Sequence, residues 1–185
     1  MPLARPAQPF GPWQTCCNRF RRWARDGTWA RLLARFQTEA DAAQDIDWLV
    51  SIDSTVVRAH QHAAGARPSP GASGEPADHA IERSPGRLTT KIHLAADGQC
   101  RPLALLVSAG HRHDSLYFEA VMNGIRVPRS GPGRPRCRPV QVSADCAYSS
   151  RTIRTYLRRR GIKATNRGQG AAEWRAEHGA STPAE

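Results

Sequence analysis

The sequence predicts a mixed α/β domain, because two apolar segments that each end in aspartate flank a strand hairpin and a helix. Residues 47–53 form a run of apolar and β-branched residues that ends in a carboxylate, and such a run is typical of a buried central strand. Residues 139–145 repeat this arrangement. A buried carboxylate is costly unless hydrogen bonds or a cation satisfy it. We therefore expect Asp53 and Asp145 to converge on one site.

The residues between these two aspartates are predicted to form the other antiparallel strands. Residues 88–94 and 101–107 are alternating or apolar runs on either side of an Asp-Gly turn, a pattern that indicates a β-hairpin. Asp114 or Ser115 is placed to cap a helix that follows. Three consecutive antiparallel strands, the first of them carrying Asp53, follow from this pattern.

A basic helix and a final strand are predicted after the second aspartate. Ser149 or Ser150 is placed to cap this helix and Gly161 to end it. Residues 162–165 are predicted to start the last strand. Between residues 151 and 167 there are seven basic residues and no acid. The candidate contacts to nucleic acid in this helix are Arg154, Arg158 and Arg159.

Two short helices are predicted before the first strand, separated by Asp26-Gly27. Apolar side chains recur at helical spacing in both, their tryptophans are expected to pack in the core, and Thr28 is placed to cap the second helix. The first helix carries arginines on its opposite face, at Arg19, Arg21, Arg22 and Arg25. Two interpretations stay open: a helix-turn-helix-like contact to DNA, or a helical hairpin packed on the core with solvated arginines.

The composition favours a polyanionic partner. The 185 residues include 27 Lys and Arg against 16 Asp and Glu, a net charge of +11, which favours nucleic acid. No apolar run approaches the roughly 20 residues that a membrane span needs, and the N-terminus lacks the apolar core of a secretion signal. We therefore expect a cytoplasmic protein without a membrane partner.

The chain is predicted to have three parts. Residues 1–45 comprise a disordered start and the two helices, and residues 46–165 form the sheet domain. A segment rich in Ala, Gly, Pro and Ser predicts a loop inserted at 60–87. Residues 166–185 lose the hydrophobic periodicity and are predicted to be a divergent, disordered tail.

Seven short motifs, spread over roughly residues 11–165, together resemble an insertion-sequence transposase of the DDE type. The group that they resemble is the bacterial one named after insertion sequence five. The motifs are Gly11–Thr15, Arg19–Trp23, Asp26–Trp29, Ile52–Thr55, Leu88–His93, Ser108–Ser115 and Ala144–Ser150. Each motif is short, but their joint occurrence in the family's order is specific.

The resemblance implies an RNase H-like catalytic core, preceded by a remnant of a helical DNA-binding region, that cuts and joins DNA at the element's ends. Asp53 and Asp145 match the first two acids of the family's metal-binding triad, which implies Mg²⁺ as the cofactor with Mn²⁺ as a substitute. The implied partners are double-stranded DNA (the terminal inverted repeats and the target) and further copies of the chain in a homo-oligomer. The implied location is the bacterial nucleoid.

The third acid of the triad, a glutamate on a later helix, has no counterpart in a matching motif. The candidates are Glu173, Glu177 and Glu185. The family's N-terminal region is also longer, so we expect a copy truncated at both ends, with little or no strand-transfer activity. Two alternatives stay open: a non-catalytic DNA-binding regulator derived from a transposase, and a magnesium nuclease on the same fold.

Overall fold

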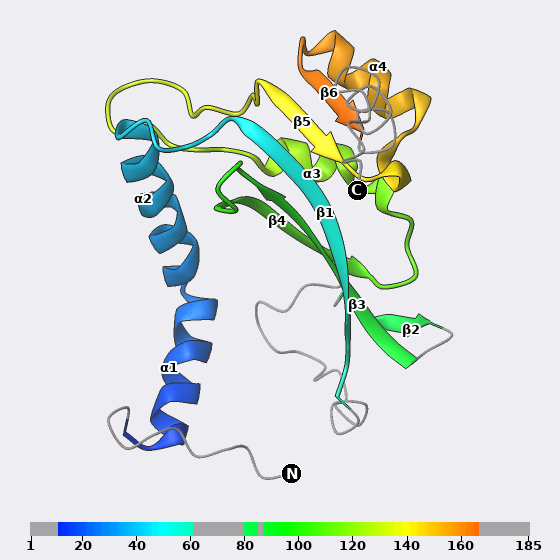
Figure 1. Ribbon diagram of the computed structural model, residues 1–185. Helices are drawn as coiled ribbons and strands as arrows, with labels where there is room; N and C mark the ends of the chain where they lie inside the picture. Colours follow the sequence, from blue (N-terminus) through cyan, green and yellow to red (C-terminus); the bar gives the residue numbers. More distant parts are fainter. Residues whose placement is uncertain (1–10, 61–79, 85–86, 167–185) are drawn as a thin grey trace, which may run out of the picture.

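A mixed β-sheet with helices on one face forms the centre of the protein (Figure 1). The computed structural model describes residues 11–60, 80–84 and 87–166. Within these ranges the strands are β1 Leu49–Arg58, β2 Glu82–Ser84, β3 Arg87–Ala96, β4 Pro102–Ala109, β5 Gln141–Ala144 and β6 Lys163–Asn166. The helices are α1 Trp13–Arg25, α2 Thr28–Ala42, α3 Phe118–Gly124 and α4 Arg151–Arg159, with short 3-10 turns η3 Asp114–Leu116 and η4 Cys146–Tyr148.

The strand order joins an antiparallel half of the sheet to a parallel half. Strand β1 is antiparallel to β3, and β3 is antiparallel to both β4 and β2. On its other edge β1 is parallel to β5, which is parallel to β6. The predicted mixed α/β sheet, preceded by helices, is confirmed. An antiparallel meander extended by parallel strands is also the RNase H-like arrangement that the sequence resemblance implies.

The predicted hairpin between β3 and β4 is present, and its aspartate explains the tight turn. Asp97 is buried and its Oδ1 accepts hydrogen bonds from the backbone N–H groups of Gln99, at 3.0 Å, and Arg101, at 2.8 Å. The carboxylate thereby satisfies two amides that the turn would otherwise leave without partners.

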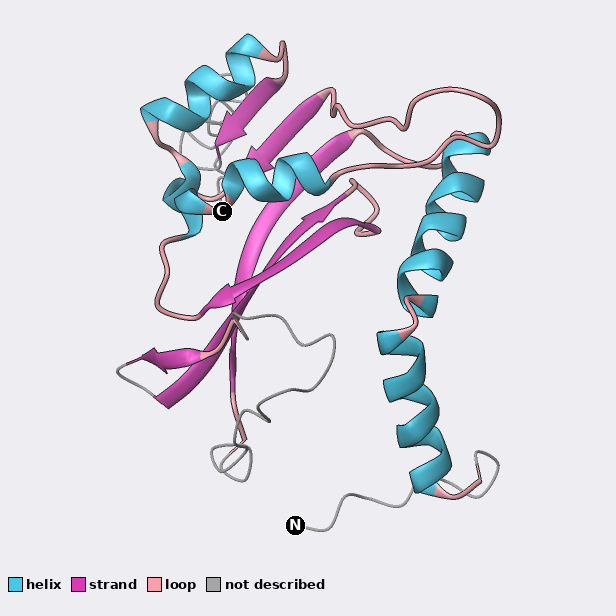
Figure 2. Ribbon diagram, turned by 180° about the vertical axis from the view of Figure 1, so that it is seen from behind, coloured by secondary structure: helices cyan, strands magenta, loops and turns pink. Residues whose placement is uncertain are grey.

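The core lies between one face of the sheet and helices α3 and α4 (Figure 2). Alternate residues of β1, Val50 and Ile52, are buried against this layer, whereas Leu49 and Asp53 on the opposite face are exposed. Strand β1 is central in the sheet, as predicted, but it is buried on this one face only. Strand β1 also does not end at Asp53: β-branched residues continue it to Arg58.

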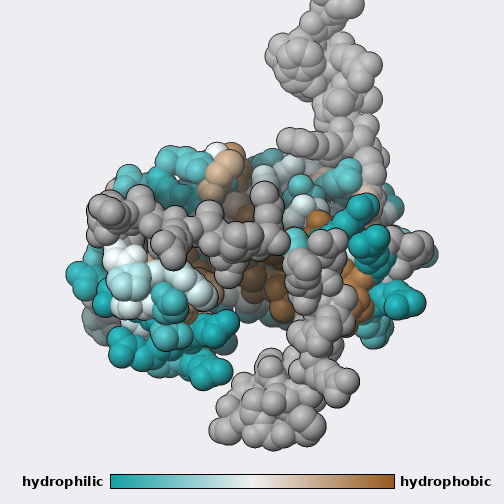
Figure 3. Space-filling model, turned by 90° about the horizontal axis from the view of Figure 1, so that it is seen from below, coloured by the Kyte–Doolittle hydropathy of each residue, from teal (hydrophilic) through white to brown (hydrophobic). Residues whose placement is uncertain are grey.

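The second face of the sheet is partly apolar, and no helix among the described residues covers it. The cross-strand register puts Asp53 beside Leu94, and Leu94 beside Leu105, so these residues lie on one face. Leu105 and Val107 of β4 are 60% and 48% exposed. Seen from below, apolar residues gather near the centre of the molecule, beside hydrophilic ones (Figure 3).

Helices α1 and α2 follow one another end to end and form an arm beside the sheet (Figures 1 and 2). Gly27 has a φ of 72°, a conformation that favours glycine. The Asp26 carboxylate accepts hydrogen bonds from the N–H and the hydroxyl of Thr28, at 3.0 and 2.6 Å. Asp26, not Thr28, therefore supplies the polar side chain at the start of α2, and the predicted cap was wrong.

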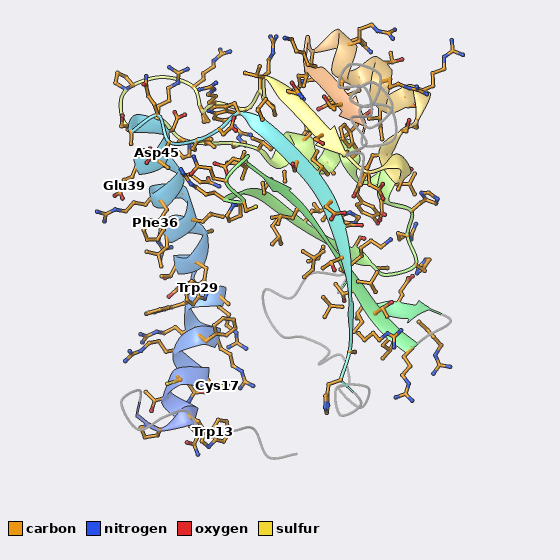
Figure 4. The ribbon with its side chains drawn as sticks, viewed as in Figure 1. Trp13, Cys17, Trp29, Phe36, Glu39 and Asp45 are labelled. Carbon is orange, nitrogen blue, oxygen red and sulfur yellow. The ribbon has the colours of Figure 1, made fainter. Side chains whose placement is uncertain are left out.

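The arm is not the predicted helical hairpin packed on the core. Phe20 and Phe36 are 60% and 65% exposed, and Figure 4 shows Phe36 on the side of α2 away from the sheet. The tryptophans of the arm do not enter the core: Trp23 and Trp29 pack edge to face at 5.2 Å, within the arm. The arm contacts the sheet through Gln37, which donates to the carbonyls of Pro102 and Leu103.

Of the other predicted caps and loops, some are confirmed and some are wrong. Ser150 caps α4 by accepting from the Ile153 N–H at 3.1 Å, and Gly161 follows the helix with a φ of 62°. Neither Asp114 nor Ser115 caps a helix with its side chain. The segment predicted as a loop at 60–87 contains β2, which pairs with the start of β3. The predicted disorder at 1–10 and 167–185, and most of that loop, fall outside the described residues.

Among the described residues, no helix combines the length and apolar character needed to cross a membrane.

Candidate functional site

Parallel pairing of β1 and β5 brings the two predicted acids together. Ser51 pairs with Ser143 and Ile52 with Ala144, so Asp53 and Asp145 occupy the next positions along chains that lie about 4.8 Å apart. Both side chains are exposed. They line one pocket of about 320 Å³ on the open face of the sheet, together with Ser51, Ser143 and Ala144.

The two carboxylates reach this pocket for different reasons. Strand β1 continues past Asp53, whose Oδ1 accepts a hydrogen bond from the Ser54 N–H at 2.7 Å. Strand β5 ends at Ala144, and Asp145 begins a turn in which its carbonyl accepts from the Tyr148 N–H at 2.9 Å. Exposure removes the large desolvation cost expected for a buried carboxylate, so both carboxylates can remain charged and accessible to a ligand from solvent.

Tyr148 is a residue of this site that the sequence reasoning did not single out. Its side chain is only 2% exposed, and burial raises the pKa of its hydroxyl to about 12. The nearby Ser54 side chain lowers the pKa in part, and the negative charges of Asp114, Asp53 and Asp145 raise it further. The hydroxyl therefore lies close enough to all three carboxylates to sense their charge. Its position three residues after the second acid was the one signal in the sequence, and it does not reveal the burial.

An ion pair anchors the loop that packs against this tyrosine. Lys91 Nζ lies 2.7 Å from Asp114 Oδ1, with side chains only 13% and 19% exposed, and it also donates to the Arg112 carbonyl at 2.9 Å. Asp114 begins η3, which contacts η4. The pair thus connects β3 to the turn that follows Asp145.

Under this loop lies a buried histidine. His93 Nε2 and Ser108 Oγ are 2.8 Å apart, and the imidazole stacks on Tyr117 with centroids 4.9 Å apart. Burial lowers the pKa of His93, although Asp114 raises it in part. His93 is therefore a structural group on the covered face of the sheet, beneath the loop and outside the pocket of the two acids.

The donor set at Asp53 and Asp145 consists of oxygens. Two carboxylates with neighbouring serine hydroxyls suit a hard cation such as Mg²⁺, which takes oxygen ligands and keeps several waters. No cluster of three or more His, Cys, Asp or Glu side chains occurs among the described residues. The candidates for a third acid, Glu173, Glu177 and Glu185, lie outside the described ranges.

The predicted DNA-binding arginines lie on two separate elements, α1 and α4, at opposite ends of the molecule (Figure 1). On α1, Arg19 and Arg22 line a shallow pocket of about 320 Å³ with Thr15 and Asn18, and Arg21 and Arg25 are exposed. On α4, all three predicted arginines are exposed: Arg154, Arg158 and Arg159.

The comparisons with known proteins show the family of the chain. Residues 45–181 match the transposase DDE domain, and this range includes both aspartates. The chain belongs to the transposase DDE domain family.

Two individual proteins are similar to parts of the chain. One is the uncharacterized protein y4sN of Sinorhizobium fredii, which is 46% identical over 62 residues, or 34% of this chain and 46% of that protein. A solved structure, the Mos1 transposase paired-end complex with left transposon end, is 13% identical with a TM-score of 0.36 and matches 76% of this chain. The matched part covers 40% of the Mos1 chain, so the chain spans less than half of either protein.

Proposed function

We propose that this chain is part of an insertion-sequence transposase, of the group named after insertion sequence five, in which Asp53 and Asp145 are two of the three metal-binding acids. The observation that carries the proposal is their position on neighbouring parallel strands, in one pocket on the open face. Membership of the transposase DDE domain family supports the same assignment.

The two carboxylates would hold Mg²⁺, or Mn²⁺ in its place, because both metals accept oxygen ligands. When bound, such an ion activates a nucleophilic oxygen and stabilises the charge of the leaving oxygen in phosphodiester cleavage. Ser51 and Ser143 line the pocket and offer hydroxyls to the waters of the site. Tyr148 and the Lys91–Asp114 pair position the turn that carries Asp145.

The proposed substrate is double-stranded DNA, at the element's terminal inverted repeats and at the target. The arginines of α1 and α4 would contact its phosphates, which is the sequence-independent part of DNA binding. The proposed active form is a homo-oligomer, and the exposed aromatic residues of the arm, Phe20 and Phe36, offer apolar surface for such an assembly. The proposed location is the bacterial cytoplasm, at the nucleoid.

For the 185-residue chain alone we propose little or no strand transfer. Asp53 and Asp145 supply two acids, and no third His, Cys, Asp or Glu joins them within the described ranges. A metal with fewer protein ligands binds more weakly and is held in a less defined position. The same observation favours a second candidate function, a DNA-binding regulator that occupies the element's ends without cutting them.

A nicking assay on supercoiled plasmid carrying the element's ends tests both candidates. In Mg²⁺ we expect no strand transfer, and in Mn²⁺ at most slow nicking that Asp53→Asn and Asp145→Asn each abolish. Robust Mg²⁺-dependent cleavage would overturn the proposed inactivity. Nicking that survives both substitutions would overturn the assignment of the acids. Complete absence of chemistry together with DNA affinity unchanged in both variants would favour the regulator.

The insertion-sequence origin has its own test in the DNA that encodes the chain. Inverted repeats that flank the coding region are expected for a transposase or for a regulator derived from one. Their absence would favour a magnesium nuclease on the same fold.

A further inference from the structure

A basic groove lies between α3 and α4, on the face of the sheet opposite the two acids. It has a volume of about 790 Å³ and is lined mainly by polar and charged residues. The lining residues are Glu119, Asn123, Arg151, Thr152, Thr155, Tyr156, Arg159 and Arg160. Three guanidinium groups against one carboxylate give this groove a net positive charge.

The groove and the acids lie on opposite faces of the sheet because successive side chains of β1 and β5 point to opposite faces. Helices α3 and α4 bury Phe118 and Ile153 in the core that also contains Ile52 and Ala144. The residues that alternate with these, Asp53 and Asp145, are exposed. A ligand in the groove therefore does not occupy the pocket of the two acids.

One arginine of the groove is held in place by its neighbours. The Arg160 guanidinium donates from Nη1 to Asn123 Oδ1 at 3.2 Å and to the Tyr156 hydroxyl, which itself donates to Asn123 Oδ1 at 3.2 Å. The guanidinium carbon also lies 5.2 Å from the centroid of the Tyr156 ring. This network leaves further N–H donors of the guanidinium for a ligand, since arginine has five, and it lowers the entropy lost on binding.

The other two arginines of the groove are not neutralised. Arg151 and Arg159 are exposed, and their side chains form no ion pair or hydrogen bond with another described residue. They are eight residues apart on α4, or about 12 Å along the helix. Spaced cations along a groove fit a chain of phosphates better than a single small anion.

We propose that this groove binds the phosphate backbone of a second stretch of DNA, separate from the stretch at Asp53 and Asp145. The inference rests on the proposed function and deepens it, because it assigns the α4 arginines of the groove to a DNA segment on the face of the sheet opposite the two acids. A transposase must hold more than one DNA segment when it joins an element to a target, and a site on each face allows this. Arg151 and Arg159 contact phosphates, and Arg160, which follows Arg159 at the end of α4, is a preset donor.

The test measures the affinity of the full chain for a fluorescent 30-base-pair duplex of arbitrary sequence, in EDTA, over a series of salt concentrations. Each lost phosphate contact makes the slope of log K against log salt shallower by about 0.9. The double variant Arg151→Gln/Arg159→Gln is therefore expected to bind about 10- to 60-fold more weakly at 0.1 M salt, with a slope shallower by about 1.8.

A matched control removes the same charge elsewhere. Arg129 and Arg134 are exposed residues of the loop between α3 and β5, which lies toward the α2 end of the sheet (Figure 1). The double variant Arg129→Gln/Arg134→Gln is expected to change affinity less than about threefold, since only the net charge changes. Glu119→Gln removes the one acid of the groove, so it is expected to strengthen binding several-fold. Thermal unfolding of each variant verifies that it is folded.

If the two double variants weaken DNA binding equally, the proposed DNA site in the groove is wrong, because net charge alone would then explain the binding. An unchanged or weaker affinity for Glu119→Gln would count against it as well. Inorganic pyrophosphate at 1 mM separates the sources of phosphate: displacement of the duplex by pyrophosphate would assign the groove to a small anion instead of DNA. The assay contains no metal, so a result against the groove leaves the proposed role of Asp53 and Asp145 to be tested by its own assay.

Discussion

Removing the charge of Lys91 tests whether an ion pair holds the loop beside the acids. Lys91→Met keeps most of the aliphatic stem but leaves the Asp114 carboxylate and the Arg112 carbonyl without their cation. The pair is short, at 2.7 Å, and its side chains are 13% and 19% exposed. Breaking a fully buried pair from one side costs about 3–5 kcal/mol. Since some water reaches this pair, we expect a loss of about 2–3 kcal/mol.

The exposed pair between Arg35 and Glu39 is the control. It has a similar N–O distance, 2.9 Å, but its side chains are 78% and 58% exposed, and such i,i+4 pairs contribute about 0.3–0.5 kcal/mol. Arg35→Gln should therefore change the free energy of unfolding by less than about 0.5 kcal/mol.

Urea unfolding, followed by circular dichroism and tryptophan fluorescence, measures both variants. Adding Asp114→Asn to Lys91→Met removes the unpaired charge and should recover part of the lost stability, with a coupling free energy of about 1–2 kcal/mol. If Lys91→Met costs no more than Arg35→Gln, the pair does not hold the loop and the reasoning fails.

Three further predictions concern the wall of the site, the loop and the core. Tyr148 has a pKa of about 12, above the usual 10, so its contribution to stability is present below pH 10 and is lost as the pH rises through 12. Between pH 9 and 12 the free energy of unfolding of the wild type should thus fall by about 2 kcal/mol relative to that of Tyr148→Phe, measured by urea unfolding. The same pH dependence in both proteins would refute the raised pKa. A Cβ at Gly110 would overlap the buried Thr89 side chain, so Gly110→Ala should cost about 1–3 kcal/mol, and an unchanged urea midpoint would contradict this packing. Phe118→Ala should cost about 3–5 kcal/mol, whereas Phe36→Ala on the arm should cost little in thermal unfolding; equal losses would place the arm in the core.

Much of the antiparallel and helical pattern could be predicted because local chemistry determines it. The Asp97 turn, the Ser150 cap and the end of α4 at Gly161 each depend on residues within a few positions of one another. The adjacency of Asp53 and Asp145 could be predicted because two apolar segments with the same ending suit neighbouring strands.

The rest depended on tertiary contacts that no local pattern contains. Apolar periodicity in α1 and α2 predicted burial, but Trp29 and Phe36 lie on an arm whose apolar side chains remain exposed. The apolar run before Asp53 predicted a buried carboxylate, whereas helices α3 and α4 cover only one face of the sheet and Asp53 lies exposed on the other. The role of Tyr148 depends on burial among residues from three distant segments, so its sequence position alone could not show it.

The direct test of the central claim is metal binding by the two aspartates. Electron paramagnetic resonance of free Mn²⁺ titrated with the chain should show binding that is lost in Asp53→Asn and in Asp145→Asn. The same binding should be retained in Asp45→Asn, an exposed aspartate near the end of α2 (Figure 4). Loss of binding only in the two site variants is the result we predict. Binding that is equal in all three variants would contradict the assignment of Asp53 and Asp145 as a metal-binding pair.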